Sequence, residues 1–347
     1  MRSWNPFIIA LRLLVSALLF GCGSEGGANA TLREALTARG IDVTALFAPP
    51  STEELSAMAR AWSREEPAPS GIREETSFVL PSGDSMRVLS HLVGEQRHYG
   101  VVIVPAGEHE PGTLPVAINL VGFGREMLLD VPTDVTALDG RFVTLIPSFR
   151  GQELRFEGQS WSSDGDPYDQ CEGGTDDALA FIEAALQSTP AASPSGLVAL
   201  GGSRGGNVAM LLGVRRQGVR AVVELAGPTD YLRGELLDQP NLTALYANYF
   251  VRELLNGGTD VAEARRRMLA CSPLHFAERL PPTQAHHGTD DLNVPLAQAE
   301  LLAERMTKLG RFPPAFQLFV YEGADHQLAE QLPLIEERVR AFFQALD

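Results

Sequence analysis

Several features are scarce in this sequence, and each scarcity excludes a class of protein. Of its 347 residues only three are cysteines, which is too few for a disulfide scaffold or a zinc site. There is no dinucleotide-binding fingerprint, and the acidic run at residues 164–169 lacks the spacing of an EF-hand, so the sequence implies no metal and no cofactor. The formal net charge of -16 argues against nucleic acid as a partner, because nucleic acid is itself negatively charged.

The sequence also lacks hydrophobic runs long enough to span a membrane. A shorter apolar stretch lies at the N-terminus. Residues 1–21 hold a short apolar stretch that is interrupted by Arg12 and followed by Cys22, and this stretch is too short to cross a bilayer as a mature helix. Its ending resembles the lipobox of bacterial lipoprotein signals, although Phe20 is bulkier than usual. We therefore expect export to the bacterial cell envelope, with lipid attached to Cys22 as the only membrane contact. A plain secretory signal is the alternative.

The two other cysteines are Cys171 and Cys271. An exported protein meets an oxidising compartment, where these two residues could form one disulfide. The alternative is two buried thiols that behave as small hydrophobic side chains. The sequence does not place the two residues near each other, so both possibilities stay open.

The chain divides into a short N-terminal part and one large domain. Residues 22–71 begin with a tether rich in glycine, serine and alanine, and continue with helix-like segments. The segment 53–66 sets Leu55, Met58, Ala59 and Trp62 on one helical face. We expect this part to be an appendage that packs on a domain spanning residues 72–347.

From residue 72 onward, short apolar runs predict a sheet. The first two are joined by a turn-rich tetrapeptide, which favours an antiparallel hairpin. The later runs alternate with helical patterns, which is typical of a mostly parallel sheet covered by helices on both faces. The predicted strands are residues 72–80, 85–93, 99–105, 116–121, 142–147, 197–200, 219–225, 283–286 and 316–321.

One of these runs leads directly into G-G-S-R-G-G at residues 201–206. A strand that passes at once into a helix must turn sharply, and glycine leaves room for the crowded backbone around the serine. This pattern predicts a nucleophile elbow that presents the hydroxyl of Ser203 near the N-terminus of a helix. A serine nucleophile needs a histidine base, and the base needs a carboxylate that orients it.

Two later segments supply such groups, and together the motifs carry a family resemblance. The motif H-G-x-x-D-x-x-V-P occupies residues 287–295, and G-x-x-H occupies residues 323–326. With the serine motif they resemble the catalytic domain of the prolyl oligopeptidase family and its dienelactone-hydrolase-like relatives. The resemblance implies the α/β-hydrolase fold, with a mostly parallel eight-stranded sheet. It further implies that Ser203 is the nucleophile, Asp291 the acid and His326 the base.

Other side chains compete for these roles. Asp290 could supply the carboxylate instead, but the offset from His287 in the family pattern favours Asp291. We interpret His287 as a structural residue that holds the acid loop. His286 stands where the family usually has an apolar residue. We interpret the remaining histidines as surface or satisfied structural residues; they are His91, His98, His109 and His275.

Backbone N–H groups are expected to form the oxyanion hole. One belongs to Arg204, the residue after the nucleophile, and the other to Phe123 in the loop after an earlier strand. That loop is similar to the family's H-G-F-G loop, with Val121 where histidine is usual. The Arg204 side chain could meet a substrate carboxylate or pair with a nearby acid, and we favour the second.

Substrate specificity is expected to lie in an insertion at about residues 228–280. Its aromatic and aliphatic side chains predict a partly apolar lid over the site; they include Tyr231, Leu236, Leu237, Leu245, Tyr246, Tyr249 and Phe250. The 71 residues before the domain cannot build the β-propeller that filters peptides in prolyl oligopeptidases. We therefore predict a small ester as substrate, with a short peptide as the second possibility. A binding protein on an inactive hydrolase scaffold is a third.

Overall fold

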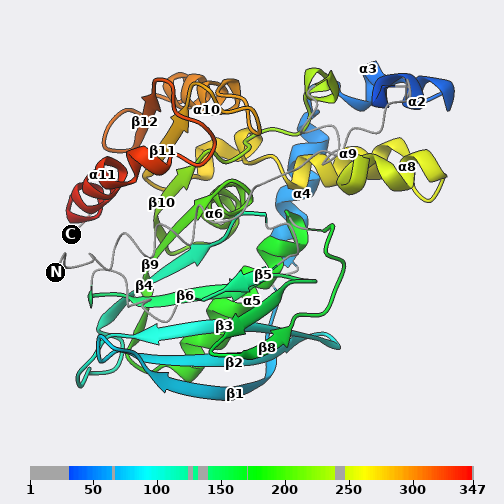
Figure 1. The fold of residues 1–347 in the computed structure, drawn as a ribbon. Helices are drawn as coiled ribbons and strands as arrows, with labels where there is room; N and C mark the ends of the chain where they lie inside the picture. Colours follow the sequence, from blue (N-terminus) through cyan, green and yellow to red (C-terminus); the bar gives the residue numbers. More distant parts are fainter. Residues whose placement is uncertain are drawn as a thin grey trace.

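The computed structural model describes residues 31–64, 67–123, 128–131, 140–169, 171–238 and 247–345 (Figure 1). Its centre is a nine-stranded sheet in the order β1-β2-β3-β6-β4-β9-β10-β11-β12. These strands are β1 (Ser70–Val79), β2 (Ser85–Val93), β3 (Gln96–Val104), β4 (Leu114–Leu120), β6 (Val143–Ser148), β9 (Ala192–Gly202), β10 (Val219–Leu225), β11 (Thr283–Gly288) and β12 (Phe316–Tyr321).

The sheet confirms the α/β-hydrolase fold and contains one strand more than the eight expected. Strands β1, β2, β3 and β6 pair antiparallel with one another in turn. From β6 through β4, β9, β10 and β11 to β12 every pairing is parallel. All nine predicted runs form strands of this sheet. At its antiparallel edge β1 pairs only with β2, and every residue of β1 is exposed or half-buried.

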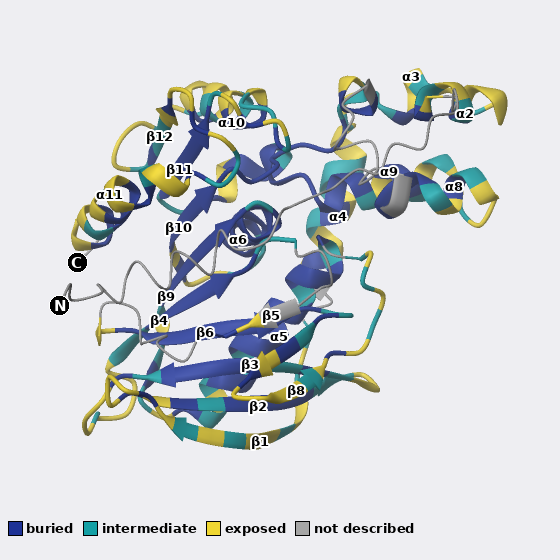
Figure 2. Cartoon of the chain, viewed as in Figure 1, coloured by how far each residue is buried: buried dark blue, intermediate teal, exposed yellow. Residues whose placement is uncertain are grey.

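Helices cover both faces of the sheet, as the apolar runs predicted. Side chains along a strand alternate between faces, and in β9 Leu197 and Ala199 join one core while Val198 and Leu200 join the other. The first core also contains buried residues of α5 (Glu172–Ser188), α6 (Arg204–Arg215) and α10 (Ala297–Lys308). The second is closed by α11 (Leu332–Gln344). Figure 2 shows the central strands buried along most of their length.

A second, three-stranded sheet was not predicted. It consists of β5 (Leu128–Asp130), β7 (Glu153–Phe156) and β8 (Gln159–Ser162), in the order β5-β7-β8. Strands β7 and β8 form a hairpin whose two turn residues, Glu157 and Gly158, both have positive φ (49° and 75°). A two-residue loop with this conformation matches the twist of a hairpin, and glycine in its second position was the available sequence signal.

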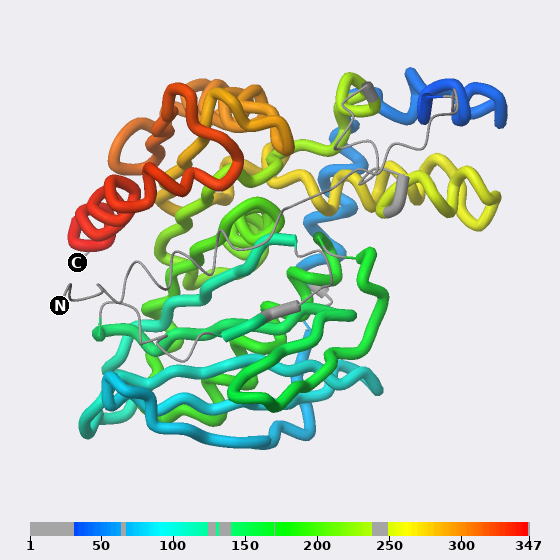
Figure 3. Tube along the Cα trace, viewed as in Figure 1, coloured from blue at the N-terminus to red at the C-terminus, as the bar shows by residue number. Residues whose placement is uncertain are grey.

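The N-terminal helices pack on the insertion as well as on the domain. They are α2 (Leu32–Ala38), α3 (Val43–Leu46) and α4 (Thr52–Arg64). In Figure 3 this blue segment lies beside the yellow helices of the insertion. Met58 and Trp62 of α4 are buried, and the Trp62 ring lies 4.6 Å from that of Phe276, between centroids.

The insertion is built from short helices. They are η2 (Gly234–Asp238), η3 (Ala247–Val251), α8 (Arg252–Asn256), α9 (Val261–Ala270) and η4 (Pro273–Arg279). The predicted lid residues Leu245 and Tyr246 lie outside the described residues, as does the whole predicted signal with Cys22. In the part of the chain that the structure describes, no helix has both the length and the apolar character needed to cross a membrane.

Candidate active site

Ser203 occupies a strained turn between β9 and α6. Its φ of 55° and ψ of -123° are rare for a residue with a side chain. Crowding explains the glycines around it: a Cβ on Gly201 would lie 2.0 Å from the carbonyl oxygen of Gly205, and one on Gly205 would lie 1.9 Å from that of Leu120. The local sequence therefore permits this turn because it offers no side chains there.

Asp291 and His326 lie close together, at the carboxyl ends of the parallel strands, where Ser203 also lies. Ser203 follows β9, Asp291 follows β11 and His326 follows β12, and parallel strands end at a common edge. The Nδ1 atom of His326 lies 2.7 Å from Oδ2 of Asp291. Asp290 instead is exposed, and its carboxylate accepts a hydrogen bond from the hydroxyl of Thr289. Of the two candidate acids, the structure places Asp291 against the histidine.

Four nitrogen atoms surround the carboxylate of Asp291. Its Oδ1 accepts from the backbone N–H groups of Asn293 and Val294, at 2.8 and 2.9 Å. Its Oδ2 is shared by His326 and by His287, whose Nε2 lies 3.3 Å away. Burial alone would raise the pKa of Asp291, but the hydrogen bonds from His287, His326 and Val294 outweigh it and hold this pKa well below its usual range. Asp291 is therefore ionised at neutral pH.

The charge of Asp291 fixes which ring nitrogen of His326 faces it as a donor. An ionised carboxylate only accepts hydrogen bonds, so Nδ1 of His326 carries the proton and Nε2 of the neutral ring bears a lone pair. Among the described residues Nε2 is buried and has no hydrogen-bond partner. This arrangement provides a base whose free nitrogen is unsatisfied within the protein.

His287 is fully buried behind the acid and is affected by the charge of a residue that the sequence analysis missed, Glu224. Its Nε2 also lies 2.8 Å from the carbonyl oxygen of Val294. Burial alone would lower the pKa of His287, but Asp291 and Glu224 outweigh it and raise this pKa. Glu224 of β10 is itself fully buried, accepts the N–H of Gly227, and has its pKa raised to about 7 by burial. The one available signal for it was an acid within a largely apolar strand.

The two predicted oxyanion residues lie on neighbouring segments. Arg204 is the first residue of α6, and Phe123 lies in the loop after β4. The Arg204 side chain runs to the carbonyls of Val121 and Gly122 in that loop, a contact that neither reading of the sequence included. Tyr249 of the insertion reaches the same loop, with its ring centroid 6.2 Å from that of Phe123.

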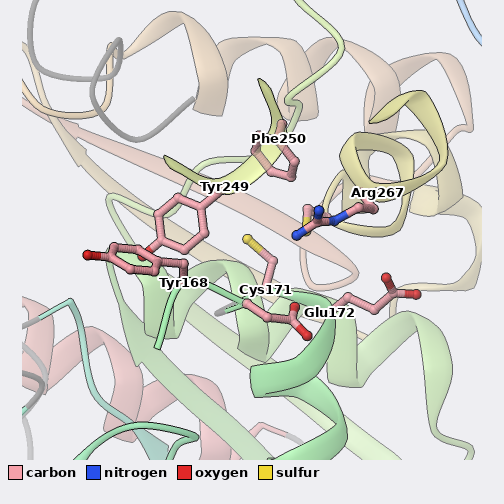
Figure 4. A pocket seen from close by; sticks show the side chains of 8 residues that line it. Tyr168, Cys171, Glu172, Tyr249, Phe250 and Arg267 are labelled. Carbon is pink, nitrogen blue, oxygen red and sulfur yellow. The ribbon is translucent and has the colours of Figure 1, made fainter. Parts of the chain in front are cut away.

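Cys171 and Cys271, which the sequence could not place, lie next to each other. Both thiols are free and buried. Burial, with the neighbouring thiol, raises the pKa of Cys271. The two residues line one small cavity, and the others around it are Tyr168, Asp169, Glu172, Tyr249, Phe250 and Arg267 (Figure 4).

The remaining histidines lie away from this arrangement. His275 pairs with Asp230 at 3.0 Å, and His109 lies 3.0 Å from the carbonyl oxygen of Pro105. His91 and His98 are buried, and none of their ring nitrogens has a hydrogen-bond partner among the described residues. The interpretation as surface or satisfied residues is therefore wrong for this last pair. His286 is buried and bonded to Tyr321 and Gln284.

The nine-stranded sheet, the strained turn at Ser203 and the Asp291–His326 pair together have the arrangement of an α/β-hydrolase. Residues 133–346 match the model of the prolyl oligopeptidase family. The chain belongs to this family. A comparison with curated proteins finds no match.

Solved structures with the same fold include both esterases and peptidases. An acetyl xylan esterase from Paenibacillus sp. R4 has a TM-score of 0.60 at 17% identity, and the match covers 87% of this chain and 98% of that one. A puromycin-hydrolysing peptidase from Mycobacterium tuberculosis has a TM-score of 0.56 at 17% identity, covering 78% and 45%. An acylaminoacyl peptidase from Pyrococcus horikoshii has a TM-score of 0.51 at 14% identity, covering 75% and 47%. This chain thus spans less than half of the two peptidases.

Proposed function

We propose that this protein hydrolyses small esters through a Ser203–His326–Asp291 triad. The observation that carries the proposal is the 2.7 Å contact between His326 and the ionised Asp291, with Nε2 of His326 left unsatisfied at the edge of the sheet that presents Ser203. These are the groups that a serine nucleophile needs for activation.

The mechanism follows from these groups. The Ser203 hydroxyl oxygen attacks the ester carbonyl carbon while its proton passes to Nε2 of His326. Backbone N–H groups of Arg204 and Phe123 stabilise the oxyanion. The tetrahedral intermediate collapses to an acyl-enzyme, and His326 gives the proton to the departing alcohol. Water then attacks the acyl-enzyme, again with His326 as base, and releases the carboxylic acid with Ser203 restored.

A fluorophosphonate probe tests the nucleophile. We expect it to label the wild-type protein once and to leave Ser203→Ala unlabelled, because phosphonylation requires an activated serine oxygen. Ser272→Ala is a matched control, since Ser272 is a fully buried serine outside the proposed triad, and it should be labelled like the wild type. Equal labelling of Ser203→Ala, or none of the wild type, would contradict the mechanism and favour an inactive binding scaffold.

Esters are favoured over peptides as substrates because this chain matches a larger share of the esterase structure than of the peptidase structures. The chain matches nearly the full length of the Paenibacillus acetyl xylan esterase, but less than half of the puromycin-hydrolysing and acylaminoacyl peptidases. The residues described before the sheet form three helices that pack on the insertion. Both observations favour a compact hydrolase for small substrates.

A substrate panel decides between the two reactions. We expect p-nitrophenyl esters of short acyl groups to be turned over with a higher kcat/KM than prolyl p-nitroanilides, and the Ser203→Ala variant to turn over neither. Faster turnover of the anilides would make the protein a peptidase with the same triad.

We further propose that the protein is exported and anchored in the bacterial cell envelope by lipid on Cys22. The support is the sequence pattern at residues 1–22, and the lipid would be the only membrane contact. The full-length protein expressed in a bacterium should enter the detergent phase on phase separation, whereas Cys22→Ser should not. If Cys22→Ser remained with the membrane, the lipid attachment would be disproved.

A further inference from the structure

The side chain of Arg204 is buried and reaches across to the loop after β4. Only 6% of the residue is exposed. One terminal nitrogen of its guanidinium donates to the carbonyl oxygen of Gly122 at 2.8 Å and approaches that of Val121 at 3.3 Å, while Nε lies 3.4 Å from the Val121 oxygen. The first residue of α6 is therefore tied to the loop that carries the second proposed oxyanion donor.

Aromatic rings hold this guanidinium in place. Its central carbon lies 4.5 Å from the centroid of the Phe149 ring and 5.9 Å from that of Phe123. Burial lowers the pKa of Arg204 to about 10, so the side chain is still charged at neutral pH. A charge in such a site acts strongly on the carbonyl dipoles it contacts, because little water screens it.

The Gly122 carbonyl and the Phe123 N–H belong to the same peptide group. This group is planar, and in the trans form its C=O and N–H point in opposite directions. A guanidinium fixed on the Gly122 oxygen therefore sets the direction of the Phe123 N–H. It also polarises the peptide group, which strengthens the N–H as a hydrogen-bond donor.

We propose that the Arg204 side chain is a positioning residue for the oxyanion hole, which aims and polarises the Phe123 N–H while its own backbone N–H supplies the other donor. The inference rests on the proposed hydrolase function. It also explains how the loop is anchored in a chain that has Val121 where similar loops have histidine.

Kinetics of Arg204→Ala and Arg204→Lys test the proposal. Loss of one oxyanion-hole donor costs about 100- to 1,000-fold in kcat, and we expect Arg204→Ala to fall by about this factor with KM within about threefold of the wild type. Affinity for an alkyl boronic acid, whose adduct with Ser203 carries an oxyanion-like oxygen, should fall by a similar factor. Arg204→Lys retains the charge but replaces the planar fork of the guanidinium with a compact ammonium that cannot keep the same donor geometry, so its loss should be intermediate.

Arg215→Ala is the matched control. Arg215 lies on the same helix about 16 Å away, its side chain is only 4% exposed, and it too stacks on an aromatic ring, that of Trp62. We expect Arg215→Ala to lower the melting temperature while kcat stays within about twofold of the wild type, because it does not touch the oxyanion loop.

The outcomes separate this inference from the function on which it rests. A wild-type protein that neither hydrolyses esters nor reacts with the fluorophosphonate would refute the proposed function itself. An active wild type combined with wild-type kcat and boronate affinity in folded Arg204→Ala would refute only the role of Arg204. If the alanine variant does not fold, Arg204→Lys decides on the same two measurements, and wild-type values there overturn the proposal.

Discussion

Two adjacent aspartates, Asp290 and Asp291, differ in burial and in their hydrogen-bond partners. Asp291 is buried and bonded to His326, whereas Asp290 is exposed and bonded to Thr289. Asp291→Asn keeps the shape but removes the charge that holds the imidazole tautomer, so kcat should fall about 1,000- to 10,000-fold. Asp290→Asn should stay within about twofold of the wild type. Steady-state kinetics on a short-chain ester would measure both, and comparable losses in the two variants would contradict the assignment.

At the scale of residues, the sequence could predict roles that short motifs encode, but not contacts between distant segments. The spacing from His287 favoured Asp291, and in the structure its Oδ2 lies 2.7 Å from Nδ1 of His326. The partners of the Arg204 side chain were not predictable, because they depend on which carbonyls of the β4 loop lie opposite α6. Glu224 was missed for the same reason, since its surroundings come from other strands and loops.

Arg265 of α9 is the main polar link between the insertion and the N-terminal helices. It forms two hydrogen bonds with Glu54 of α4, at 2.8 and 3.0 Å, and donates to the carbonyls of residues 45, 46 and 48, each at 2.9 Å. Arg265→Ala leaves these acceptors without their donor, and we expect the free energy of unfolding in urea to fall by about 2–4 kcal/mol.

The next residue provides the control for this prediction. Arg266 is exposed and pairs with Glu263 and Glu172 on the surface. Exposed ion pairs contribute about 1 kcal/mol or less, so Arg266→Ala should be nearly neutral. Equal destabilisation by the two variants would show that the N-terminal helices are not held through Arg265.

The two buried thiols should join α5 to the end of α9 under oxidising conditions. Cys171 directly precedes α5 and Cys271 directly follows α9. With glutathione disulfide, one thiolate attacks the disulfide and releases one glutathione, and the second thiolate then displaces the other. We expect a loss of two mass units, no retained glutathione, and a gain of up to about 4.7 kcal/mol in the free energy of unfolding for a closed loop of about 100 residues.

Mass spectrometry and thermal melting check this expectation. Cys271→Ser cannot close the bridge and should gain no stability from the oxidant. A folded wild type that keeps both thiols, or that retains glutathione on one of them, would show that the pair does not bond. The disulfide stays a prediction, which is supported by the two residues lining the same small cavity.

At the scale of elements, apolar runs predicted the central strands of the large sheet because those strands are buried on both faces. The small sheet was missed because its strands are short and carry exposed polar residues, such as Arg155 in β7 and Gln159, Ser160 and Ser162 in β8. The packing of the N-terminal helices on the insertion was not predictable either. It depends on a long-range contact, that of Arg265 with Glu54.

The stability of the whole molecule should depend on pH through histidines that are buried in neutral form. His91 is fully buried between His98 and Phe181, and the charged group that faces it is Asp177. Burial, with repulsion from His98, lowers the pKa of His91 to about 4. His286 is also buried in neutral form, because burial and the charge of Arg338 lower its pKa to about 3.

The sign of the effect follows from proton binding. Above pH 6.5 His91 is neutral in both states and has no effect. Between pH 6.5 and about 4 the unfolded chain binds a proton that the folded protein does not, so the free energy of unfolding falls by about 1.4 kcal/mol per pH unit for this group. His91→Leu removes the titrating ring without breaking a recorded hydrogen bond. From pH 6.5 to 5 the wild type should therefore lose about 2 kcal/mol more than this variant.

Urea unfolding at a series of pH values would measure the difference in slope. Phe181→Leu is the control, because it alters the packing against the His91 ring but removes no titratable group. Its stability should be lower at every pH and run parallel to that of the wild type. If the stability of His91→Leu also ran parallel to that of the wild type, His91 would bind its proton equally in the folded and unfolded states. The acid sensitivity would then come from other groups, and His286 and its neighbour Arg338 would be the next residues to replace.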